Sequence, residues 1–184
     1  MKTFYGAPAS WLNIAASFVA FGIGMIIIGR GGSGTDATVV GAPLLTLSEA
    51  LKLIIGMCLI AQATALSGVL GRSGPRAIGI VAGLAMLTAG AIGLATIWLP
   101  MAGNWGSVVN LIALCGVAAT GLWAALSAFW GLRCKDLPTW LCVVGFLLAI
   151  PSLAAPFLPP IALAAFVFGI IWNFGVGLRL SHTA

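Results

Sequence analysis

Charged side chains are scarce in this chain, and acidic ones are the scarcest. Three Asp and Glu and eight Lys and Arg occur among its 184 residues. The charged fraction is therefore 6%, against roughly 25% in soluble domains. The hydrophobic fraction is 61% and the mean hydropathy is +1.18. This composition excludes a soluble globular domain and is typical of an integral membrane protein.

Side chains that ligate metals or transfer protons are also nearly absent. The single histidine, His182, lies in the C-terminal tail, so no apolar run offers an axial haem ligand or a histidine base. Asp36, Glu49 and Asp136 fall outside the expected membrane interior, which disfavours a proton-coupled pump. We expect no catalytic residue, no metal site and no cofactor, and hence no enzyme.

The basic residues and the cysteines form no motif. The net charge is +5, but the basic residues are spread thinly over the chain rather than clustered, so we expect no nucleic-acid partner. The four cysteines show no C-x-x-C spacing and are interpreted as small apolar residues. We expect no disulfide between Cys134 and Cys142, because the loop between them is predicted to be cytoplasmic.

Long uncharged runs are what the chain has in abundance. Ala77 to Leu99 is 23 residues without a charge, and roughly 20 apolar residues cross a bilayer as a helix. The sequence predicts an all-α fold, a single transmembrane domain over residues 1–184 with six helices. The predicted spans are about 11–29, 48–70, 77–99, 107–130, 139–155 and 161–180.

Two of these spans carry further signals. The spacing Thr46-Leu-Ser-Glu49 is that of a capping box and predicts the start of the second span, with Glu49 and Lys52 as a solvated ion pair at its outer end. In the third span Gly79, Gly83, Gly90 and Gly93 share one narrow face. Small residues on one face let two membrane helices approach closely, so these four glycines are predicted to form a helix-packing face.

Neutral polar residues remain as candidates for a site within the membrane. They are Asn13, Gln62, Thr64, Thr88, Asn110, Thr120 and Asn173. One interpretation is hydrogen bonding between helices, and the other is a polar site for a small neutral ligand. Gln62 and Asn173 are the strongest candidates for such a site, because they lie deepest in their spans.

The distribution of basic residues predicts the orientation of the six spans. Membrane proteins keep Lys and Arg on the cytoplasmic side, and cytoplasmic termini place six of the eight basic residues there. The second, fourth and sixth spans each end with glycine close to arginine, as in Gly71-Arg72. This recurrence indicates three helical hairpins, although C-cap chemistry alone also favours glycine and a basic residue at helix ends.

The chain resembles the HdeD-like family of bacterial inner-membrane proteins. The stretch Gly83-Leu-Ala-Met-Leu-Thr-Ala-Gly90, the helix end Leu99-Pro100 and the repeated Gly131-Leu-Arg133 and Gly177-Leu-Arg179 carry the likeness. The resemblance implies a non-enzymatic, six-span protein of the bacterial inner membrane, linked to acid stress, with no catalytic residues to transfer.

Three functions are compatible with these patterns. The first is a non-enzymatic protein that acts by packing against lipids or protein partners, including a homo-oligomer, in stress tolerance. The second is an accessory subunit of a larger respiratory or photosynthetic complex. The third is a channel or carrier for a small neutral solute, centred on Gln62 and Asn173.

The orientation yields a direct prediction. A reporter fused after Ala184 is expected to be active on the cytoplasmic side, because both ends of a six-span protein lie on the side that holds most basic residues. Paired phosphatase and fluorescent-protein fusions measure this. A reporter found on the outer side would overturn the six-span topology.

Overall fold

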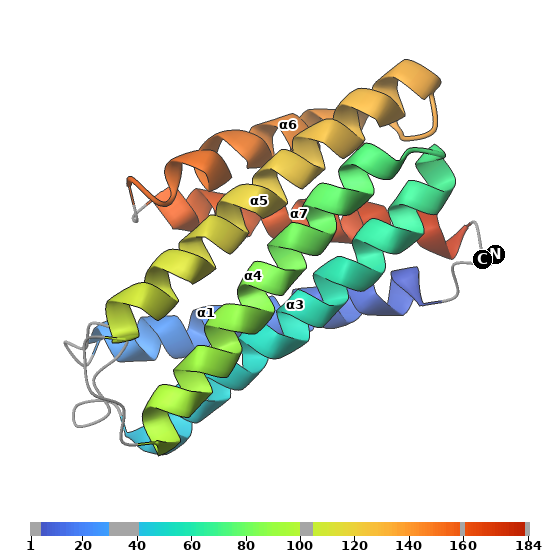
Figure 1. Cartoon of the computed structure of the whole chain (residues 1–184). Coiled ribbons are helices and arrows are strands. Elements are labelled where there is room, and N and C mark those ends of the chain that lie inside the picture. The colour runs from blue at the N-terminus through green and yellow to red at the C-terminus, as the bar shows by residue number, and fades with distance from the viewer. Residues whose placement is uncertain (1–4, 30–40, 100–104, 159–160, 183–184) are drawn as a thin grey trace.

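All regular structure in the described part of the chain is helical (Figure 1). The computed structural model describes residues 5–29, 41–99, 105–158 and 161–182. Its helices are α1 (Gly6–Gly29), α3 (Ala42–Leu70), α4 (Ser73–Trp98), α5 (Trp105–Cys134), α6 (Thr139–Ala154) and α7 (Ala162–Ser181). The predicted all-α membrane bundle is confirmed as a fold class.

Five of these helices are long and apolar enough to cross a membrane. The exception is α6, which has 16 residues. At 1.5 Å per residue, α6 is about 24 Å long, and the hydrocarbon core is about 30 Å thick. The six predicted spans therefore correspond to five helices of membrane length and one shorter apolar helix.

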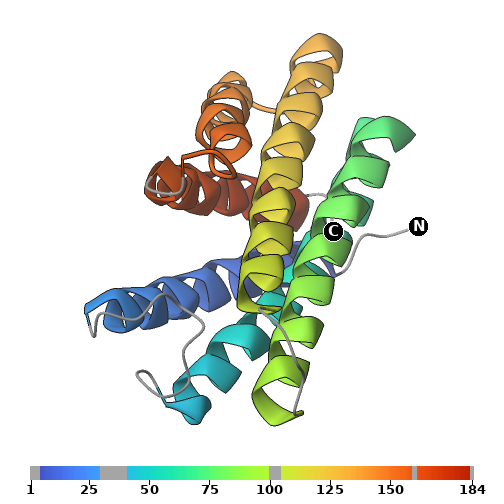
Figure 2. The same ribbon diagram turned by 60° about the vertical axis from the view of Figure 1, so that its left-hand side comes forward.

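The helices form a closed ring of neighbours rather than three separate hairpins. Each helix packs against the next one in the chain, and α7 returns to pack against α1. The most extensive contact joins α3 to α4, which belong to different expected hairpins. Figures 1 and 2 show α4 and α5 side by side, with α1 and α7 inclined to them.

Where α3 and α4 approach most closely, a glycine of one helix faces a glycine of the other. A Cβ at Gly83 would lie 2.6 Å from the carbonyl oxygen of Gly56, and a Cβ at Gly56 would lie 2.7 Å from that of Gly83. Further along, a Cβ at Gly90 would lie 2.8 Å from the carbonyl oxygen of Glu49. At these points the two backbones touch, so no side chain larger than hydrogen fits.

All four glycines of the predicted packing face are buried. Gly79 lies against Ala63 of α3 and the Trp123 ring of α5, and Gly93 lies against the side chain of Glu49. The partner of this face is thus chiefly α3 of the same chain.

The start of α3 differs from the sequence prediction. The helix begins at Ala42, after Gly41 at φ 90°, and Pro43 lies in its first turn. Thr46 lies one turn further in and donates its hydroxyl to the carbonyl of Ala42 at 2.8 Å. The predicted capping box is wrong, because Pro43 already starts the helix and leaves Thr46 to bond back along it.

Two tryptophans form the centre of the core on the other side of the bundle. Trp123 of α5 and Trp172 of α7 are almost completely buried. Their rings meet edge to face at 5.9 Å, and Gly145 of α6 leaves the space that Trp172 occupies. Trp130, two turns along α5, instead lies beneath the guanidinium of Arg72. Within α5, Trp123 therefore packs in the core, whereas Trp130 packs at the helix end.

The glycine contact gives a stability prediction. Gly83→Ala is expected to destabilise the protein by about 1–3 kcal/mol, because the new Cβ overlaps the α3 backbone. Gly22→Ala is the matched control, since nothing lies within 4 Å of a Cβ there, and it should stay within about 1 kcal/mol of wild type. Unfolding in detergent micelles measures both. Equal stabilities for the two variants would contradict the close contact.

Candidate functional site

Three buried amides from three helices meet inside the bundle. They are Asn13 of α1, Gln62 of α3 and Asn173 of α7, and none is more than 7% exposed. The Nδ2 of Asn13 donates to Oδ1 of Asn173 at 3.2 Å and, more weakly, to Oε1 of Gln62 at 3.5 Å. We call these three residues the amide cluster.

The amide cluster brings together the two residues that the sequence singled out. Gln62 and Asn173 are joined through Asn13, whose two amide protons serve one residue each. Asn13 was only one of several neutral polar residues in the sequence, and its central role was missed. The available signal was its position within the apolar first span, where an amide requires a partner.

The hydrogen-bonding capacity of the cluster is not fully used. Ser17 donates to Oδ1 of Asn13 at 3.2 Å, and Nδ2 of Asn173 donates to the carbonyl of Gly169 at 2.7 Å. The Nε2 of Gln62 is buried without a partner among the described residues. A buried donor left unpaired costs about 1–3 kcal/mol, so the cluster is more than a set of satisfied helix contacts.

A cavity of about 190 Å³ lies beside the cluster. Asn13 and Asn173 line it, whereas Gln62 does not. Its other polar lining residues are Ser17, Thr120 and Ser152, and the remaining lining residues are apolar. All six helices contribute to the lining. No charged side chain lines it. Apolar walls with a few convergent polar groups are characteristic of small-molecule sites.

The size and chemistry of the cavity limit what it can hold. A cavity of about 150 Å³ accepts a benzene ring, so this one suits a molecule of similar size. Thr120 donates its hydroxyl to the carbonyl of Gly116 at 2.8 Å, which leaves the asparagines as the main polar groups. The site can accept a neutral molecule with one hydrogen-bonding group.

Aromatic rings from α1 and α7 pack beside this cavity. Phe166, which lines the cavity, stacks on Phe21 at 4.4 Å and meets Phe18 edge to face at 5.6 Å. Phe18 is more than half exposed on the outer surface of the bundle. Phe166 therefore links one wall of the cavity to aromatic side chains of α1.

Glu49 is a second buried polar group, away from the cavity. Its carboxylate is 2.6 Å from Nζ of Lys52, one turn along α3. The residue is 6% exposed, and its Oε2 has no hydrogen-bond partner in the described ranges. The predicted pairing with Lys52 is present, but the predicted solvated position is wrong. Gly93 of α4 leaves room for the side chain to fold between the helices.

Redox and metal chemistry have little support in the described residues. No group of three or more His, Cys, Asp or Glu gathers there to hold a metal ion. All four cysteines are free thiols, with Cys58 and Cys142 buried and Cys115 and Cys134 exposed.

The fold and the site together define a multi-pass helical membrane protein with a polar centre. Comparisons with protein-family models, with curated proteins and with solved structures find no match for this chain. The resemblance to the HdeD-like family stays a prediction from sequence, and the site is interpreted from its own geometry.

The amide cluster predicts an energetic coupling that a double-mutant cycle measures. Asn13→Ala and Asn173→Ala are expected to be coupled by about 0.6–2 kcal/mol, because they share a buried hydrogen bond. Asn13→Ala with Thr96→Ala is the control pair, since Thr96 bonds to its own helix and lies outside the cavity, and its coupling should stay below about 0.5 kcal/mol. Equal coupling energies for the two pairs would contradict a hydrogen-bonded amide cluster.

Proposed function

We propose that the protein is a channel or carrier for a small neutral solute. The observation that supports this function is the meeting of Asn13 and Asn173 at the wall of a cavity of about 190 Å³ inside an apolar bundle. Amides at membrane depth are costly unless they are paired or serve a ligand. A cavity lined without charge selects a neutral solute.

The glycine face no longer supports a docking function. The sequence alone leaves open whether the helix that packs on Gly79, Gly83, Gly90 and Gly93 belongs to this chain or to another membrane protein. Their contacts are with α3 and α5 of the same chain. The large exposed side chains, such as Val81 and Ile150, need only lipid around them. The buried polar site is therefore the feature that a function must explain.

The solute is held by hydrogen bonds at one end and by apolar contact at the other. Asparagine amides offer both a donor and an acceptor, so a hydroxyl or an amide group fits equally well beside Asn13 and Asn173. Met86, Leu148 and Phe166 line the same cavity and pack around the remainder of the molecule. Binding needs no charge compensation, because neither partner is ionised.

Solute flux into liposomes tests this function. Propanamide and butanamide are suitable probes because each is small and neutral and carries one amide group at one end and an apolar chain at the other. Liposomes with the wild-type protein are expected to equilibrate at least one of them several-fold faster than empty liposomes. Gly169→Leu should abolish the gain, because a side chain there enters the cavity with only Leu148 near its Cβ, at 4.0 Å.

Two further variants define the outcome. Gly22→Leu adds the same side chain where nothing lies within 4 Å of the Cβ, and it should leave flux unchanged. Replacing Gln62 and Asn173 together by leucine should lower flux. Equal flux in wild-type and Gly169→Leu liposomes for both probes would refute the proposed function.

A further inference from the structure

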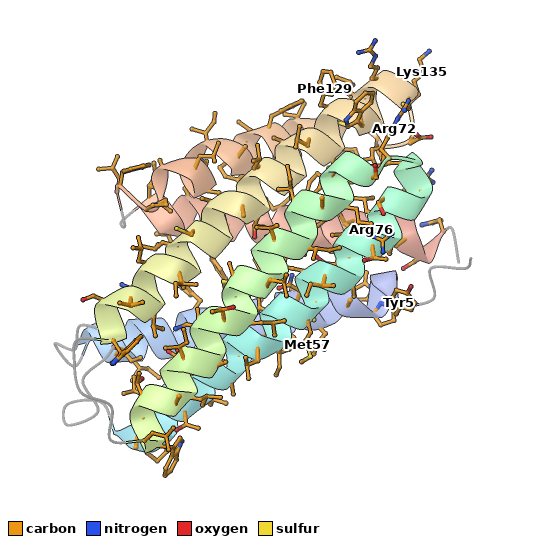
Figure 3. All side chains as sticks on the ribbon, in the orientation of Figure 1. Tyr5, Met57, Arg72, Arg76, Phe129 and Lys135 are labelled. Carbon is orange, nitrogen blue, oxygen red and sulfur yellow. The ribbon has the colours of Figure 1, made fainter. Side chains whose placement is uncertain are left out.

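A second cavity lies at the turn between α3 and α4, at the basic end of the bundle. Its volume is about 450 Å³, and Tyr5, Thr64, Arg72, Ser73 and Arg76 are among the residues that line it. Figure 3 shows Arg72, Arg76 and Tyr5 at the same end of the molecule as Lys135. We call this cavity the basic pocket. It plays no part in the proposed solute site.

Local backbone geometry places the arginines around this pocket. Gly71 adopts a left-handed conformation, with φ 59°, that ends α3, and Arg72 is extended and precedes α4. Because the turn is so short, the first turn of α4 lies beside the last turn of α3. The N-terminus of α4 has no side-chain cap. The backbone N–H groups of its first turn are therefore available as donors near the two guanidinium groups.

The charge in the basic pocket is uncompensated. No acidic side chain lines it, and Glu49 is paired with Lys52 elsewhere. Arg76 makes no ion pair within the described residues, and Arg72 lies 4.6 Å above the Trp130 ring. A guanidinium that stacks on a ring keeps its N–H donors free at the edge. Two such groups and backbone N–H donors suit a phosphate.

The position of the pocket indicates where the phosphate comes from. The pocket lies at the ends of α3 and α4, both long enough to cross the bilayer, which is the level of the lipid headgroups. Tyr5 is 51% exposed at its edge, as expected for an aromatic side chain at a membrane surface. We infer that the basic pocket binds the phosphate of an anionic lipid headgroup.

Lipid retention on the purified protein tests this inference. In native mass spectrometry from detergent, wild-type protein is expected to retain phosphatidylglycerol in preference to phosphatidylcholine with the same acyl chains. Each arginine near an anionic headgroup contributes roughly fivefold in affinity. Arg76→Gln, which removes no hydrogen bond or ion pair among the described residues, should weaken retention about fivefold. Arg72→Gln with Arg76→Gln should weaken it about thirtyfold.

A charge-matched control and a free-phosphate arm complete the test. Arg133→Gln with Lys135→Gln removes two positive charges from the same end of the bundle, outside the pocket, and should change retention by less than about twofold. Equal losses in both double variants would show diffuse attraction and overturn the inference. Displacement of phosphatidylglycerol by equimolar inorganic phosphate would assign the pocket to free phosphate instead. Equal retention of phosphatidylglycerol and phosphatidylcholine by the wild-type protein would also refute the inference.

Discussion

The close approach of α3 and α4 at Gly56 and Gly83 is the constraint on which the bundle depends. In lipid, apolar side chains gain little by leaving one apolar medium for another, so helices associate through van der Waals contact and hydrogen bonds. Small residues let two helix backbones approach closely enough for such contact, and here Gly56 of α3 faces Gly83 of α4. α1 packs against α3 of this pair, α5 packs against α4, and α6 and α7 complete the ring.

The opposite side of the bundle is held together by a different interaction. Few glycines of α1 oppose another helix closely, and Gly22 and Gly24 have nothing within 4 Å of a Cβ. Asn13 instead joins α1 to α3 and α7 by hydrogen bonds. Two hydrogen-bonded amide side chains bridge a longer distance between helix backbones than a glycine contact does, so this side tolerates wider spacing between helices. Wider spacing is the condition for a cavity.

The sequence was sufficient to predict the fold class and the glycine face, and each prediction has a clear physical reason. Uncharged runs of membrane length require helices, and the spacing of Gly79, Gly83, Gly90 and Gly93 requires a shared face. The partner of that face was not predictable, because Gly56 is a single glycine without a pattern. Gln62 and Asn173 could be chosen by depth, whereas their meeting through Asn13 depends on how three helices cross.

Glu49 shows why local motifs failed at the start of α3. The spacing Thr46-Leu-Ser-Glu49 fits a capping box, and nothing within those four residues argues against it. Pro43 and Gly41 start the helix earlier, which moves Glu49 from the cap into the interface with α4. Burial of a carboxylate is costly. Here Lys52 neutralises the charge, and the absence of a side chain at Gly93 provides the space.

The inclination of α1 and α7 to α4 and α5 (Figure 2) explains why the cavity lies where it does. Two helices that cross at an angle touch near the crossing point and diverge on either side of it. The amide cluster ties α1 to α7 and α3, and the cavity follows directly beside it, with walls from both inclined helices. Phe166 and Phe21 fill part of the divergence between α1 and α7. The polar groups of Asn13 and Asn173 are therefore held at the wall of the space that the crossing leaves open.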